Sequence, residues 1–179
     1  VRVADNRRIS VTERQAALDA LSLARQGCTA AEIQTFLEAD GGNSDIFVAV
    51  NTLELLKKSG RVTAAGAALG AMLSIKPVLR IQGGKLDAYR KVRGMRCAMQ
   101  AMIEGLQEDA HRLEGPLTVR AAYAGDLEAG QRWRDALQQA FPNCTVGLDP
   151  LPLSVCCHVG WGALGVGIAR DNTLEAKKT

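Results

Sequence analysis

The hydrophobic and polar positions along the chain follow two periods, one typical of helices and one typical of strands. Apolar residues recur every three or four positions, as on the buried face of a helix, over residues 10–26, 29–37, 52–58, 95–110 and 126–141. Shorter apolar runs, bounded by turn-forming residues and typical of strands, lie at 45–50, 77–81, 85–92, 117–124, 144–148, 154–159 and 163–170. Residues 63–73, rich in Ala and Gly, predict a further thin helix.

Polar residues at three of the expected helix starts can accept hydrogen bonds from free backbone N–H groups. Ser10 with Glu13, and Thr29 with Glu32, have the spacing of a capping box. Asp126 stands where the N-cap of the helix ending near 141 is expected. These residues predict where three helices begin.

The strands at 77–81 and 85–92 flank the turn Gln82-Gly83-Gly84, which predicts an antiparallel hairpin. The other strands alternate with helices, an order that favours parallel neighbours. We therefore predict an α/β (α+β) fold: a mixed β-sheet that contains an antiparallel hairpin and is covered by helices.

The composition of the 179-residue chain is that of a globular protein, with 47% hydrophobic and 23% charged residues. A net charge of +3 is too small to indicate a nucleic-acid partner, and 4% aromatic residues provide no base-stacking platform. No apolar run reaches the roughly 18 residues of a transmembrane helix. The five cysteines are odd in number and lack CxxC spacing, which favours a reducing compartment, so we expect a cytoplasmic protein.

Cations gather where a helix start is expected. Lys91, Arg93 and Arg96 surround Gly94, near which the helix of 95–110 should begin. The free N–H groups and the helix dipole at such an end favour negative charge, so clustered cations there are unfavourable unless an anion binds. The pattern indicates an anion site.

Three phrases in order resemble the signatures of the bacterial DegV family. LSIKPVLRIQGGKL (73–86) with KVRGMRCAM (91–99) is similar to LNIKPIL…DGK…KVRTRKKA. NTLELLKKSGRV (51–62) resembles DTLEYLRKGGRI, and HVGWGALGVG (158–167) resembles HTGPGALG. The matching phrases cover most of the chain, so it is identified as a member of this family.

The resemblance implies two domains and a missing portion. Residues 1–62 correspond to a remnant of the N-terminal α/β domain, and 63–179 to the C-terminal α/β domain. Complete relatives carry more sequence before the first phrase, and this chain begins without Met. We therefore expect a fragment that lacks the N-terminal half of its pocket.

The family binds a long-chain fatty acid in an apolar tunnel and presents the carboxylate to a fatty acid kinase subunit. The resemblance implies that Arg93 and His158 lie at the ligand head group, with Arg96 and the Gly-Arg pair at Arg61 nearby. Gly160, in the Gly-rich run after His158, would allow close backbone approach. Met72, Met99, Met102, Leu69 and Leu73 could supply apolar wall. The expected protein is a carrier and not an enzyme, with the fatty acid as ligand and no other cofactor.

The sequence departs from the family phrase HTGPGALG at two positions, and its basic cluster and cysteines allow other interpretations. Val159 and Trp161 replace the usual Thr and Pro. A zinc site at Cys156, Cys157 and His158 is disfavoured, because neighbouring strand residues point to opposite faces. A small regulatory domain that binds a phosphorylated ligand around Arg93 stays an alternative, as does a basic interaction module without a ligand.

Overall fold

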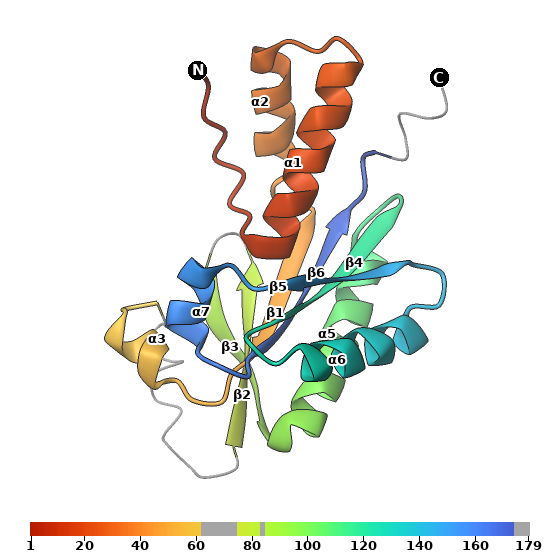
Figure 1. Cartoon of the computed structure of the whole chain (residues 1–179). Coiled ribbons are helices and arrows are strands. Elements are labelled where there is room, and N and C mark those ends of the chain that lie inside the picture. Colours follow the sequence, from red (N-terminus) through yellow and green to blue (C-terminus); the bar gives the residue numbers. More distant parts are fainter. Residues whose placement is uncertain (62–74, 83–84, 174–179) are drawn as a thin grey trace.

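The computed structural model describes residues 1–61, 75–82 and 85–173, which form a six-stranded sheet with helices on both faces (Figure 1). The mixed, helix-covered sheet expected from the sequence is confirmed. The strands are β1 Ser44–Ala49, β2 Ile75–Gln82, β3 Lys85–Arg93, β4 Leu117–Tyr123, β5 Val146–Pro150 and β6 Leu164–Arg170. The helices are α1 Ser10–Arg25, α2 Ala30–Asp40, α3 Glu54–Lys58, α5 Gly94–Arg112, α6 Leu127–Ala140 and α7 Leu153–Val159.

The strands lie in the order β3-β2-β1-β6-β4-β5. The predicted hairpin is confirmed: β2 and β3 pair antiparallel, with Ile81 opposite Leu86. β1 pairs antiparallel with β2 on one side and with β6 on the other, so it lies inside the sheet. Only β4 and β5, which α6 connects, run parallel among the described strands. The sheet is therefore mixed, and its centre joins strands from distant parts of the sequence.

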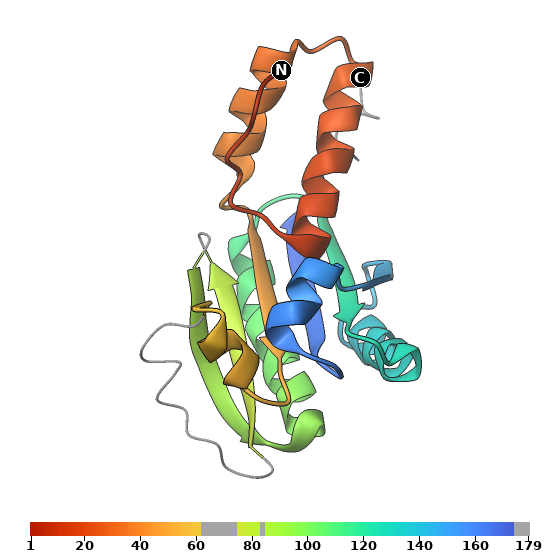
Figure 2. The ribbon, with the colours of Figure 1, turned by 60° about the vertical axis from the view of Figure 1, so that its left-hand side comes forward.

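Alternation along β1 separates the two faces of the sheet. Phe47 and Ala49 pack in one core cluster with residues of α5 and α6, including Trp133. Val48 points to the other face and packs in a second cluster with Leu56 beside α3 and α7. Figure 2 shows α7 and α3 over one side of the sheet and α5 over the other. The site described below lies on the Val48 face.

Two of the three predicted helix caps are confirmed. The side chains of Thr29 and Glu32 form a reciprocal capping box, and Asp126 accepts a hydrogen bond from the N–H of Ala129 at 2.9 Å. The capping box expected at Ser10 is wrong. Helix α1 begins at Ser10 itself, whose φ is 56°, and the Thr12 hydroxyl donates to the carbonyl of Ile9 at 3.0 Å.

The strand predicted at 154–159 is also wrong, because these residues form helix α7. Pro152, at the N-cap, accepts backbone hydrogen bonds from the N–H groups of Val155 and Cys156. Val155 and Val159 then lie four positions apart on one side and pack in the same cluster. A short, β-branched apolar run fits a strand or one buried helical turn equally well, so periodicity alone misassigned it.

Several expectations fall on undescribed residues. The helix predicted at 63–73 lies outside the described residues, as do Leu69, Met72 and Leu73. The proposed domain boundary at 62/63 adjoins the same stretch. Strand β1 precedes this boundary in the sequence, and it pairs with β2 and β6, which both follow the boundary.

Candidate functional site

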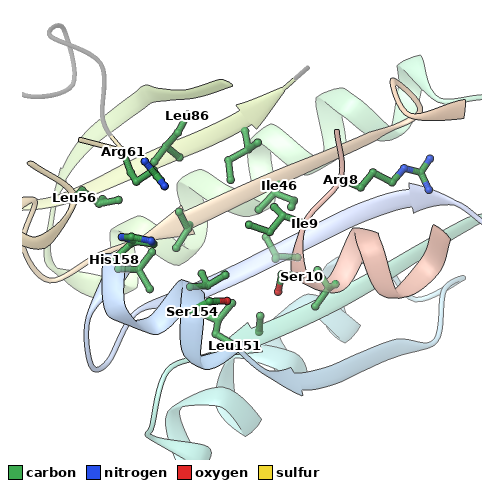
Figure 3. A pocket seen from close by; sticks show the side chains of 18 of the residues that line it. Arg8, Ile9, Ser10, Ile46, Leu56, Arg61, Leu86, Leu151, Ser154 and His158 are labelled. Atoms are coloured by element: carbon green, nitrogen blue, oxygen red, sulfur yellow. The ribbon is translucent and has the colours of Figure 1, made fainter. Parts of the chain in front are cut away.

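A pocket of about 590 Å³ lies on the Val48 face of the sheet, between the strands, α7 and the start of α1 (Figure 3). This volume is within the range of roughly 300–1,000 Å³ typical of small-molecule sites. Most of the lining side chains are aliphatic, and the charged ones come from the segment before α1 and from the turn after α3. The lining residues are Asp5, Arg7, Arg8, Ile9, Ser10, Val11, Ile46, Val48, Leu56, Arg61, Ile81, Leu86, Ala122, Leu151, Ser154, Val155, His158, Val159, Gly165 and Val166.

The floor of the pocket follows from strand alternation. Ile46 and Val48 point to the same face of β1, two positions apart, while Phe47 between them fills the opposite core. Ile81, on β2, pairs with Ile46, and Ala122 lies on β4, which is on the other side of β6 from β1. The floor is consequently apolar and continuous across four strands.

The walls come from helices and from the chain that enters α1. Ser154 and His158 are four residues apart on α7, so they share the helix face that turns toward the pocket. Ile9 and Val11 contribute from the other side. Of these wall residues, the sequence pointed only to His158. The four-residue spacing of Ser154 and His158 would have indicated a common face if α7 had been assigned as a helix.

One end of the pocket carries the polar groups that suit an anion. Figure 3 shows the side chains of His158 and Arg61 near each other, beside Leu56. The Nδ1 atom of His158 is buried and has no hydrogen-bond partner among the described residues. An unpaired buried nitrogen is costly, so a ligand oxygen at this end would satisfy it.

The other end is closed by a buried charge network. The Arg8 guanidinium turns away from the pocket (Figure 3) and donates to the carboxylate of Asp40 at 2.7 Å. Asp19 is fully buried, 3.9 Å from Arg8, and burial raises the pKa of its carboxyl despite hydrogen bonds from Gln15 and Asn172. The charge of Arg8 is thus compensated by two carboxylates within the protein.

The residues predicted for the site divide into two groups. His158 and Arg61 line the pocket, whereas Arg93, Arg96 and Gly160 do not. Arg93 is the exposed N-cap residue of α5, and Arg96 is exposed in the first turn of that helix. The helix start near Gly94 is thus confirmed, with its cations facing solvent.

Arg93 nevertheless lies at the same end of the sheet as the turn that follows His158. It pairs with Ile75 at the beginning of β2. The neighbouring Lys76 donates from Nζ to Asn51 Oδ1 at 2.9 Å, and Asn51 Nδ2 donates to the carbonyl of Trp161 at 2.9 Å. This chain of contacts links the basic helix start to the Gly-rich turn.

Gly160 ends helix α7 with a φ of 80°, a conformation that side chains rarely adopt. A Cβ there would also lie 3.0 Å from Leu55 Cδ1. The glycine therefore shapes the turn directly after His158. Met99 and Met102, considered as tunnel wall, pack instead in the core beneath α5 on the opposite face of the sheet.

The described residues contain no group of three or more His, Cys, Asp or Glu side chains that could hold a metal ion. All five cysteines have free thiols. Within the described part of the chain, no helix combines the length and the apolar character needed to cross a bilayer.

The helix-covered mixed sheet makes this chain an α/β protein, with an apolar pocket on one face that has the volume of a small-molecule site. It belongs to the DegV family: the family model described as "Uncharacterised protein, DegV family" matches residues 1–171.

Among curated relatives, a DegV domain-containing protein of Deinococcus radiodurans is 31% identical over 151 residues, which is 84% of this chain and 53% of the relative. A protein of Thermotoga maritima named "Fatty acid-binding protein" is 32% identical over 163 residues, covering 89% of this chain and 54% of the relative. The chain therefore spans about half the length of these relatives.

Solved structures show the same fold. A DegV family protein from Thermus thermophilus, described by its fatty acid binding, superposes with a TM-score of 0.82 at 26% identity, over 95% of this chain and 61% of that one. A fatty-acid-binding DegV family protein from Streptococcus agalactiae gives a TM-score of 0.84 at 25% identity, over 96% and 60%.

Proposed function

We propose that this protein is a carrier that holds a long-chain fatty acid in the pocket, with the carboxylate at the His158 and Arg61 end. One observation carries the proposal: an apolar pocket of about 590 Å³ ends at a buried imidazole nitrogen without a partner and a guanidinium. The names of the Thermotoga maritima and Thermus thermophilus relatives support the same ligand class.

The physical chemistry of the pocket suits such an amphipathic ligand. Burying each CH₂ group contributes about 0.8 kcal/mol, so a long acyl chain gains most of its affinity from the aliphatic floor and walls. The carboxylate needs a hydrogen-bond donor and a compensating charge when it leaves water. His158 supplies the former when Nδ1 carries a proton, and Arg61 the latter.

The proposal extends to the surface at this end of the sheet. Arg93 and Arg96 are exposed there, and Gly160 sets the turn after His158. We assign these residues to the surface that contacts a partner fatty acid kinase, where cations would balance the charge of the acyl phosphate formed on the carboxylate. The chemistry belongs to the kinase, so the carrier needs no catalytic residue and no cofactor.

Native mass spectrometry with organic extraction tests the proposal on this chain and on a version extended to the length of the curated relatives. The wild type should retain a fatty acid. His158→Ala should weaken retention about tenfold or more, because a hydrogen bond to a charged group contributes roughly 1.5–3 kcal/mol. Arg61→Ala should have a similar effect.

The matched control is His111→Ala, which removes the other histidine of the chain. His111 is exposed on α5, which packs on the face of the sheet opposite the pocket. Its lipid content should equal that of the wild type. An extended version that neither carries nor takes up fatty acid would refute the carrier proposal. Binding of inorganic phosphate that depends on Arg93 would then favour the phosphorylated-ligand alternative.

A further inference from the structure

The pocket floor contains a glycine that neither the backbone nor the packing requires. Gly165 lies in β6 and lines the pocket. It is not among the glycines with positive φ, so its backbone conformation is open to any residue. A Cβ built there would lie 3.5 Å from the Phe47 carbonyl oxygen and 3.6 Å from Ala122 Cβ, which are ordinary contacts.

The next glycine of the same strand is different. A Cβ on Gly167 would lie 2.5 Å from Val11 Cγ2 and 3.0 Å from Thr12 Cγ2, so the packing of α1 on the sheet requires glycine there. At Gly165 no comparable neighbour exists among the described residues. A glycine inside a strand weakens that strand by about 0.5–1 kcal/mol, so its presence at 165 calls for another reason.

The direction of the missing side chain supplies that reason. The Cβ would point toward Ala122 and Val48, which both line the pocket, and Ala122 is the cross-strand partner of Gly165. Two of the smallest residues thus lie side by side in the floor at the level of Val48. Neither residue sends a large side chain into the pocket.

We infer that Gly165 and Ala122 determine which acyl chains fit, by leaving room for chains of larger cross-section, such as cis-unsaturated or methyl-branched ones. This inference rests on the proposed function. A cis double bond bends the chain and a methyl branch widens it, so each needs space beside a straight chain's path. A side chain at 165 would fill that space while leaving the straight path open.

Competition between two acids of equal length, one straight and saturated and one cis-monounsaturated, tests the inference. The chain, and a version extended to the length of its curated relatives, are each offered an equimolar mixture, and the retained acids are extracted and quantified. Gly165→Val should shift the ratio toward the saturated acid by about tenfold, the discrimination typical of one or two methyl groups in an apolar pocket. Ala122→Val should shift the ratio in the same direction, and Gly165→Ala should shift it less.

Gly42→Ala is the matched control, since a Cβ there meets nothing within 4 Å and Gly42 is exposed. Its ratio should equal that of the wild type, and melting curves of Gly165→Ala should show a fold at least as stable. If total loading persists but every variant keeps the wild-type ratio, the inference is wrong while the carrier function stands. If the wild type retains neither acid, the carrier function itself fails.

Discussion

The clearest perturbation of a single residue is at Asp109, on α5. Its carboxylate accepts a hydrogen bond from Arg80 at 2.5 Å, and Arg80 also contacts Asp45 at 3.3 Å. Arg112 donates to Asp45 from the same helix. Burial, and then the neighbouring charge of Asp45, raise the pKa of Asp109 to about 6. Two buried carboxyl groups thus share two arginines, and the second carboxyl resists ionisation.

We expect this group to give the protein a measurable pH dependence. The folded state binds the Asp109 proton more tightly than the unfolded state, so its contribution to stability falls as pH rises from near 4 to about 6. Going from pH 7 to pH 5, this group should therefore add about 1 kcal/mol to the free energy of unfolding. Urea unfolding at both pH values measures this difference. Asp109→Asn should flatten the difference, whereas the exposed control Glu54→Gln should keep it.

At the scale of the elements, local patterns predicted what local interactions determine. Helix α5, the β2–β3 hairpin and the caps at Thr29 and Asp126 follow from spacing and turn residues within a few positions. Helix α7 was missed because the choice between a strand and one buried turn depends on packing against α3 and the sheet. Nothing within those seven residues decides it.

The site was predictable to a smaller extent. Arg61 and His158 came from family phrases, and both line the pocket. Ile9 and Val11 could not be found from the sequence, since they reach the pocket only when α1 packs on the sheet. Ser154 was missed because α7 was assigned as a strand. Arg93 was predicted both from its place at a helix start and from the family phrase, and it does not line the pocket.

A cap substitution tests the energetics of a single element. In α2, Thr29 Oγ1 accepts from the N–H of Glu32, and Glu32 accepts from the N–H of Thr29 at 2.7 Å. Thr29→Ala removes one half of this box and should lower the free energy of unfolding by about 1 kcal/mol, measured by urea denaturation. Thr35→Ala, an exposed substitution within the same helix, should cause no such loss. Equal stability of the two variants would contradict a capping role.

At the scale of the whole molecule, a buried network joins four separate segments. Arg8 precedes α1, Asp19 lies on α1, Asp40 ends α2 and Asn172 follows β6. Asn172 Nδ2 donates to Asp19 Oδ2 at 3.2 Å and to Asp40 Oδ2 at 3.0 Å, while Arg8 donates to Asp40. The helical pair α1–α2, which Figure 1 shows projecting beyond the sheet, is thereby fixed to the segment after β6.

Removing the cation of this network should be among the most damaging single changes. Arg8→Met leaves two buried carboxylates without compensation and should cost about 3–5 kcal/mol of unfolding free energy. Chemical denaturation followed by circular dichroism measures it, with Arg132→Met on the exposed face of α6 as a control that stays within roughly 1 kcal/mol. Adding Asp19→Asn and Asp40→Asn to Arg8→Met should recover part of the loss. An Arg8→Met variant as stable as the wild type would show that the network does not stabilise the fold.

The position of β1 has a consequence for how the protein is made. Its partner β6 is near the end of the described chain, so β1 emerges from the ribosome long before β6, the strand that pairs with one of its edges. Pairing over such sequence distances is slow, because loop closure must precede any reward in contacts. Until then the apolar edge of β1 is open to other chains, and molecular chaperones have their greatest opportunity to act on the nascent protein in that interval.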